Sequence, residues 1–290
     1  MKTQIVVVVL ALVLGLVSYS IADEQAALGK LSAAAAAAKE KKAADVSAAI
    51  KDASDIIAKD SSDAGEVAAP IGREMSATFS NLAKSAQAKV PSDFAIESAT
   101  DEVKDIYGLV IPGAKGDFAA AATYVRSLIA KAPEEVKGKL EDAAKGLDDA
   151  AAGKGDKAKA FGKARAVVLS TIDIYRADAL VKAGKGDDAA VLLNRVGTYL
   201  NAEANIASKA GRTSDHDALG EYSSLAKSTA VDLARGVPEG TMKGEDEGIE
   251  YAVAGAAAPA ETAPKAAEAP KMSEEQKAQK KELKPAKGEK

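Results

Sequence analysis

Residues 161–200 carry the clearest helical pattern in the chain and restrict its fold more than any other stretch. Apolar side chains recur there at three- and four-residue steps on both sides of a Gly-Lys-Gly-Asp junction, residues 184–187. Glycine readily adopts the left-handed conformation that ends a helix, and aspartate accepts amide hydrogens at the start of the next one. We therefore predict a helical hairpin in which Gly184 ends the first helix and Asp187 caps the second.

The composition extends this prediction to the whole chain. Of its 290 residues 66 are alanine, only 4% are aromatic, and tryptophan is absent. Alanine favours helices, whereas strands prefer the aromatic and β-branched residues that are scarce here. We expect an all-α fold, a multi-helix bundle of antiparallel helical hairpins with about seven helices and a disordered C-terminal tail.

The chain divides into four segments by its pattern of apolar, charged and helix-breaking residues. These are a signal peptide (1–22), an N-terminal helical unit (23–112), a C-terminal helical unit (113–238) and a disordered tail rich in Ala, Pro, Lys and Glu (239–290). The first segment has a lysine, a long apolar run and the small-residue site Ser20-Ile21-Ala22, which is typical of a cleaved leader. The alternative is an uncleaved membrane anchor, because residues 3–22 are long enough to cross a bilayer.

Several helix boundaries follow from glycine, proline and capping residues. We expect one long helix over residues 24–59, a break over residues 60–65, and a helix that ends where Pro112 stops it. Ser92 and Asp117 are expected to cap helices. Residues 211–217 are expected to form a polar loop before the last helix.

Charge and cysteine content exclude several classes of protein. The net charge is −4 with both signs interspersed, which disfavours a nucleic-acid partner because no basic face forms. The absence of cysteine excludes disulfides, thiolate metal sites and a cysteine nucleophile. No cofactor motif is present, so we expect no cofactor; the alternative is iron or another transition metal.

His216 is the only histidine and lies between Asp215 and Asp217. An imidazole with nearby carboxylates is a donor set for a transition metal, and Glu203 from another helix would add an oxygen ligand. The alternative, which we favour, is a solvated helix start in which Asp215 or the preceding serine caps the helix.

Arg176 and Arg195 lie among tyrosines and apolar residues of the predicted hairpin. A guanidinium group in such a position can bind the carboxylate of a partner through two hydrogen bonds. The alternative, which we again favour, is a structural salt bridge, for instance to Asp173 or Glu203.

The residues from Tyr175-Arg176 to Arg195, with Gly186-Asp187-Asp188-Ala189-Ala190 between them, resemble the extracytoplasmic helical domains associated with high-affinity iron permeases. The resemblance implies a soluble accessory part of iron uptake. The Arg-Glu-x-x-Glu motif of the permeases is not met, because Arg73-Glu74 is followed by Met, Ser and Ala.

Together these patterns predict an exported, extracytoplasmic, non-enzymatic protein of the periplasm that binds an envelope protein or polymer, or scaffolds part of the envelope. The alternative function is a soluble metal-binding component of iron uptake. A membrane contact is expected only if the N-terminal segment stays uncleaved.

Overall fold

A computed structural model describes residues 22–237 and 242–257. These residues form helices with no strand among them, which confirms the all-α prediction for the described part of the chain. That part contains ten helices, more than the sequence indicates. The predicted leader, apart from its last residue, and the last 33 residues of the predicted tail (258–290) lie outside the described residues.

The helices follow one another in chain order. They are residues 22–39, α2 (Ala43–Asp63), α3 (Ala68–Ala88), the continuous run α4, η1 and α5 (Asp93–Asp105, Ile106–Val110 and Ile111–Ala114), α6 (Phe118–Ile129), α7 (Glu134–Ala151), the continuous run α8, η2 and α9 (Lys157–Ala166, Val167–Thr171 and Ile172–Lys182), α10 (Gly186–Lys209), α11 (Thr213–Ala234) and α12 (Asp246–Ala257). Connections of a few residues join the helices up to α11; residues 235–245, of which 238–241 are not described, separate α11 from α12. Segments η1 and η2 are π-helical turns inside longer helices.

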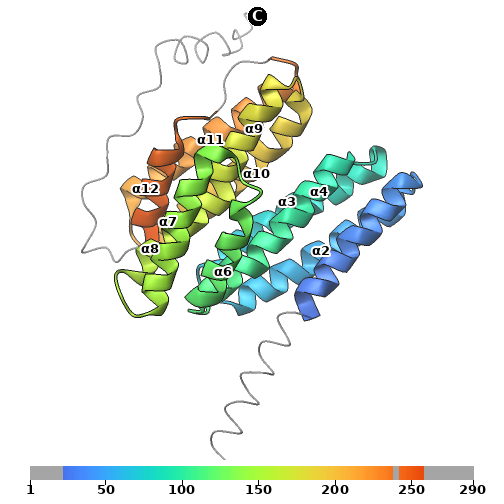
Figure 1. Ribbon diagram of the computed structural model, residues 1–290. Coiled ribbons are helices and arrows are strands. Elements are labelled where there is room, and N and C mark those ends of the chain that lie inside the picture. The colour runs from blue at the N-terminus through green and yellow to red at the C-terminus, as the bar shows by residue number, and fades with distance from the viewer. Residues whose placement is uncertain (1–21, 238–241, 258–290) are drawn as a thin grey trace, which may run out of the picture.

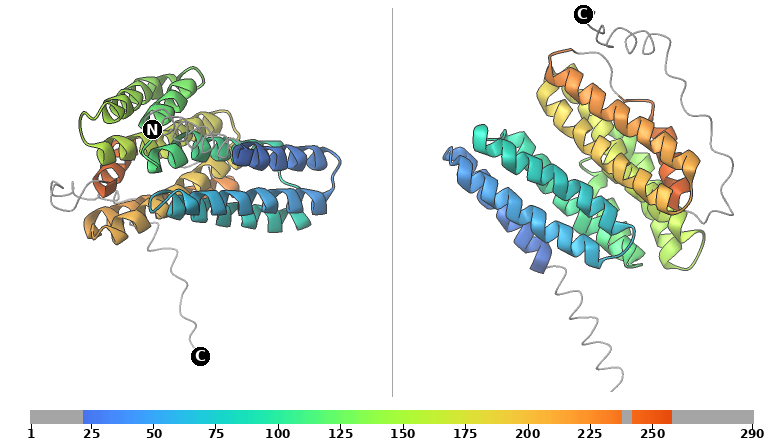
Figure 2. Two further views of the ribbon diagram at one scale, coloured as in Figure 1. Left: turned by 90° about the horizontal axis from the view of Figure 1, so that it is seen from below. Right: turned by 180° about the vertical axis from the view of Figure 1, so that it is seen from behind.

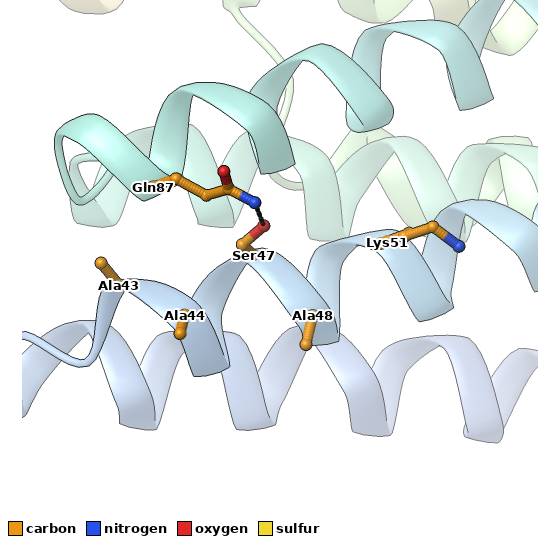
Figure 3. Close-up of a pocket in the computed structure, with 6 residues that line it drawn as sticks. All are labelled: Ala43, Ala44, Ser47, Ala48, Lys51 and Gln87. Carbon is orange, nitrogen blue, oxygen red and sulfur yellow. Dashed lines mark hydrogen bonds between the residues drawn. The ribbon is translucent and has the colours of Figure 1, made fainter.

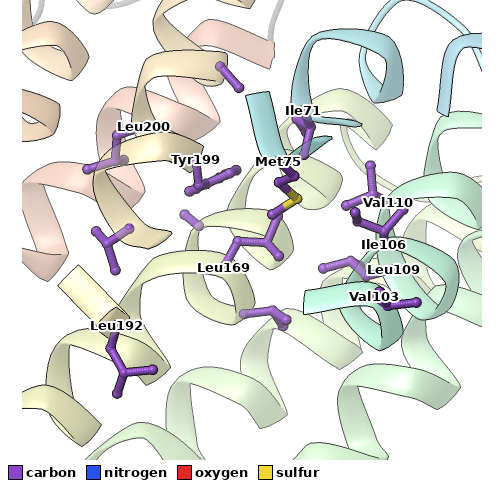
Figure 4. Close-up of a cluster of buried hydrophobic side chains, with 14 of the residues drawn as sticks. Ile71, Met75, Val103, Ile106, Leu109, Val110, Leu169, Leu192, Tyr199 and Leu200 are labelled. Atoms are coloured by element: carbon purple, nitrogen blue, oxygen red, sulfur yellow. The ribbon is translucent and has the colours of Figure 1, made fainter. Parts of the chain in front are cut away.

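Consecutive helices pack side by side and share one core. Helix α2 lies along α3, α6 along α7 and α10 along α11, while α12 packs on α8 (Figures 1 and 2). Helix α3 also packs on α10, so the N-terminal helices are joined to the C-terminal ones. In Figure 4, Met75 of α3 lies between Ile106 of η1 and Tyr199 of α10. The buried apolar side chains form one cluster that extends from Ala27 to Val253.

The single helix expected over residues 24–59 is wrong, because the chain turns back at Lys41. This residue has a φ of +56°, in the left-handed region that usually favours glycine. Each half has only a weak apolar stripe, and folding back lets both stripes share one core. Leu31 and Ile50 are fully buried as a result. The break expected from residue 60 is also shorter, since α2 continues to Asp63.

Pro112 does not stop its helix, contrary to the sequence-based expectation. The helix passes through it because the preceding turn, η1, is π-helical, and the N–H of Ile111 donates to the carbonyl of Ile106 five residues earlier. A wider turn changes the hydrogen-bonding register, so the N–H that proline lacks falls where the ladder is already interrupted. The boundary predicted between the two helical units therefore lies inside a continuous helix.

Three helix starts are capped by side chains, as the sequence predicts for the first two. Ser92, Asp117 and Asp156 each accept a hydrogen bond from the backbone N–H three residues further on, over 3.2, 3.0 and 3.1 Å. These contacts are local, so the sequence signal was sufficient to predict them.

The central hairpin is only partly capped as expected. Gly184 has a φ of +72° and follows the end of α9, which confirms its role. Asp187 does not cap the next helix, because α10 already begins at Gly186 and has no side-chain cap. Asp187 lies in the first turn instead, where its negative charge interacts favourably with the positive end of the helix dipole.

The polar loop expected over residues 211–217 is shorter than predicted. Helix α10 ends before Gly211, whose φ is +74°, and α11 begins at Thr213. His216 therefore lies in the first turn of a helix. Neither Ser214 nor Asp215 caps it, since the residue before α11 is Arg212 and no side chain forms a cap hydrogen bond.

The expectation of a disordered segment from residue 239 is wrong for the part that forms α12. Ile249 and Val253 of this helix are fully buried, and Met242 before it is 1% exposed. The segment has too few large apolar residues to order itself alone, but α8, α10 and α11 provide the surface that covers it. No helix among the described residues has the length and apolarity needed to span a bilayer.

Candidate functional site

A buried cluster of charged side chains joins α4, α9 and α10. It contains three acids, Glu102, Asp105 and Asp173, and one base, Arg195, and none of these residues is more than 6% exposed. Arg195 Nη2 donates to Asp105 Oδ2, and Arg195 Nε lies 3.2 Å from Asp173 Oδ2 without hydrogen-bond geometry. One guanidinium group therefore pairs with acids from two other helices.

Further groups complete the cluster. Tyr124 of α6 donates from its hydroxyl to Asp105 Oδ1 over 2.7 Å. At the rim, Arg176 Nη1 lies 3.6 Å from both Asp101 Oδ2 and Asp173 Oδ1. The ring of Tyr124 can come this close because η1 has a glycine, Gly108, at the contact, where a Cβ would lie 2.2 Å from the ring.

The cluster contains three acids and one base, and burial raises the pKa values of the acids. Burial raises the pKa of Glu102 to about 8, although Arg195 opposes the shift. Burial also raises the pKa of Asp105 to about 6 against the opposing effects of Arg195 and Tyr124. The pKa of Asp173 is raised by burial too. Loss of hydration disfavours a charged carboxylate, and one guanidinium group cannot compensate for three.

A second buried pair lies close to the other π-helical turn. Arg165 of α8 and Glu203 of α10 are both fully buried and form two hydrogen bonds, Nε to Oε1 over 2.7 Å and Nη2 to Oε2 over 3.1 Å. The guanidinium carbon also lies 4.4 Å from the centre of the Phe161 ring. Tyr199 is buried beside this pair, and burial and Glu203 raise the pKa of its hydroxyl.

The two arginines predicted to bind a partner form ion pairs within the bundle. Arg195 is 4% exposed, and both Arg195 and Arg176 lie near Asp173, which confirms the preferred interpretation of a structural salt bridge for that acid. Glu203, the other acid considered, pairs with Arg165. Arg176 remains half-buried at the rim.

The four residues predicted to bind a metal are not brought together. His216 Nδ1 lies 2.9 Å from the carbonyl oxygen of Ala204, and Asp215 forms an ion pair with Arg212 over 3.1 Å. Asp217 is exposed, and Glu203 is held by its arginine partner. Among the described residues no group of three or more His, Asp or Glu side chains has an arrangement that could hold a metal ion.

Helix α12 is attached to the bundle by a polar contact as well as by its apolar face. Lys139 Nζ of α7 lies 2.8 Å from Asp246 Oδ2 and 2.7 Å from Glu250 Oε1. Thr171, the last residue of η2, donates to the same oxygen of Glu250 over 3.3 Å. The contact therefore links α12 to the turn that immediately precedes the helix containing Asp173.

Two hollows on the outer surface have no contact with either buried cluster. One, of about 450 Å³, lies between α2 and the C-terminal end of α3, where Gln87 donates to Ser47 over 3.4 Å (Figure 3). The other, of about 300 Å³, lies between α3 and the C-terminal end of α10. Their linings are, respectively, Ala43, Ala44, Ser47, Ala48, Lys51 and Gln87, and Pro70, Arg73, Glu74, Asn205, Ser208 and Lys209.

Glu102, Asp105 and Arg165 are not among the candidate residues predicted from the sequence, although their neighbours in the chain contain a signal. Glu102 and Asp105 flank Val103, a fully buried residue, and Arg165 lies between two buried alanines. Charged residues within an apolar stripe indicate buried ion pairs. Their partners could not be inferred, because they are separated by 38 to 90 residues in the chain.

Comparison with known proteins does not place the chain in a family. No protein-family model matches it, and no significant match was found among curated proteins or solved structures. The resemblance to domains associated with iron permeases stays a sequence-based prediction.

Proposed function

We propose that the chain is an exported, non-enzymatic helical scaffold that binds a protein or polymer of the cell envelope through its outer surface. The observation that carries the proposal is that the buried arginines form ion pairs with acids of other helices. Arg195 and Arg165 hold acids of other helices inside the bundle, so these charges fix the helices relative to one another. A scaffold needs such a fixed surface, whereas a binding centre needs side chains that face the ligand.

The outer surface offers a place for such a contact. The hollow along α2 is lined by small side chains with Lys51 and Gln87 at its edge, and it opens outward. The export part of the proposal rests on the leader pattern in residues 1–22. The metal-binding alternative is not advanced, because its predicted ligands lie apart.

The proposal can be tested in the producing cells by fractionation and photo-crosslinking. A photoreactive amino acid replaces Ala48, in the hollow, and in a matched control it replaces Ala119, an exposed alanine of α6. We expect the mature chain in the extracytoplasmic fraction without its leader. We also expect a discrete adduct with an envelope component from Ala48 and none from Ala119.

Two results would contradict the proposal. Recovery of the chain in the cytosol with residues 1–22 intact would exclude export. Equal, diffuse labelling from both positions would show that the hollow has no specific partner.

A further inference from the structure

Glu102 differs from the other two acids of its cluster because no ion pair joins it to another described residue, whereas Asp105 and Asp173 both pair with Arg195. Asp173 Oδ2 also lacks a hydrogen bond, but it lies 3.2 Å from Arg195 Nε. The side chain of Glu102 is enclosed, with 3% of the residue exposed, and Oε1 has no hydrogen-bond partner. Asp105 receives hydrogen bonds from Arg195 and Tyr124. An enclosed carboxylate oxygen without a donor is very costly when the group is charged, and a carboxylic acid that carries a proton costs much less.

We propose that Glu102 is a proton-binding site that makes the packing of α4 against α9 and α10 depend on the pH around the protein. The proposal does not depend on the scaffold function or on the location of the chain.

Charge balance around Glu102 supports this inference. The charged groups that act on Glu102 are Asp105 of its own helix α4, Asp173 of α9 and Arg195 of α10. Around them, Tyr124 of α6 donates to Asp105, and Arg176 of α9 lies 3.6 Å from Asp173 and from Asp101 of α4. At the rim, Asp101 and Arg176 offset each other. Inside, Arg195 offsets one of the two remaining acids, so the cluster is already negative when Glu102 is neutral. A proton on Glu102 prevents a second uncompensated negative charge.

The sign of the pH effect follows from the pKa of Glu102, which burial raises from 4.5 to about 8. Between these values the folded protein keeps a proton that the unfolded chain has released. Stability is therefore highest below the lower value and is lost as pH rises through the upper one. Ionised Glu102 would draw water into the cluster or move α4 away from α10.

The position of the cluster would carry this change to the rest of the bundle. Asp105 immediately precedes the π-helical turn η1, and Asp173 follows η2 by one residue. Single π-helical turns inside α-helices are frequently found at functional sites. Opening at Glu102 would therefore act where both long helices already depart from regular geometry.

The test compares the wild-type chain with Glu102→Gln, which keeps the size of the side chain but cannot ionise. Glu97→Gln is the matched control, because Glu97 is exposed on the same helix. Urea unfolding is measured from pH 6.5 to 8, above the value of about 6 to which the pKa of Asp105 is raised. The unfolding constants of the wild-type protein and of Glu97→Gln should rise by an extra factor of about ten per pH unit, relative to Glu102→Gln, near pH 6.5, and this extra rise should weaken as pH approaches 8.

A direct titration keeps the test decisive if Glu102→Gln does not fold. The carboxyl carbon of Glu102 is followed by NMR in the wild-type chain, and its midpoint should lie near pH 8. A midpoint near the usual value for glutamate, about 4.3, would overturn the proposal. So would an unfolding constant with the same pH dependence in Glu102→Gln as in the wild type.

Discussion

Replacement of Glu203 by glutamine would test how the buried pair with Arg165 contributes to stability. The change keeps the shape of the side chain but leaves the guanidinium group of Arg165 without a negative partner. Both side chains are fully buried, and Arg165 Nη1 already has no hydrogen-bond partner. Removal of one partner from a buried ion pair costs about 3–5 kcal/mol of folding free energy. The Phe161 ring would still stabilise the charge by about 0.5–2 kcal/mol, so we expect a loss of about 3 kcal/mol.

A double replacement shows whether the loss of folding free energy comes from the unpaired charge or from changed packing. Arg165→Met with Glu203→Leu removes both charges and fills the space with apolar groups, and such replacements are often neutral or stabilising. We expect the double variant to be clearly more stable than Glu203→Gln alone. Asp52→Asn is a surface control, because Asp52 and its partner Lys30 are both about half exposed.

Urea unfolding, followed by the helical circular dichroism signal, measures all three variants against the wild-type protein. A cost below about 1 kcal/mol for Glu203→Gln would show that the charge of Arg165 is not enclosed as the structure indicates. A double variant as unstable as the single one would show that packing, and not the unpaired charge, determines the loss.

Three further changes test the backbone and the attachment of α12. Lys41→Gly should stabilise the protein by about 1 kcal/mol in thermal unfolding, because a glycine adopts the positive φ without strain; an unchanged midpoint would contradict the turn. Gly113→Ala should destabilise it by about 1–3 kcal/mol in urea, because the new Cβ would lie 2.1 Å from the Phe161 ring. Phe161→Leu in that background should restore part of the loss, and no restoration would argue against this contact. Lys139→Met should speed protease cleavage within residues 242–257 without a matching loss of overall stability, since Lys139 holds two acids of α12. Equal cleavage rates would show that the apolar face alone holds this helix.

Helix content and local caps could be predicted from the sequence because they depend on neighbours in the chain. The alanine-rich composition determined the fold class, and Ser92, Asp117 and Gly184 act where the pattern placed them. Each of these contacts joins residues within one turn of helix, so a short stretch of sequence contains all of the residues involved.

The tertiary structure alone decided which charges meet and which weak segments become ordered. Arg195 was recognised as a candidate, but its contact with Asp105 crosses 90 residues and needed the packing of α4 on α10. Helix α12 is too poor in apolar residues to order itself, and it is helical because other helices cover it. The backbone turn at Lys41 and the passage through Pro112 follow for the same reason. The free energy gained by burying a shared core outweighs local conformational preferences of about 1 kcal/mol per residue.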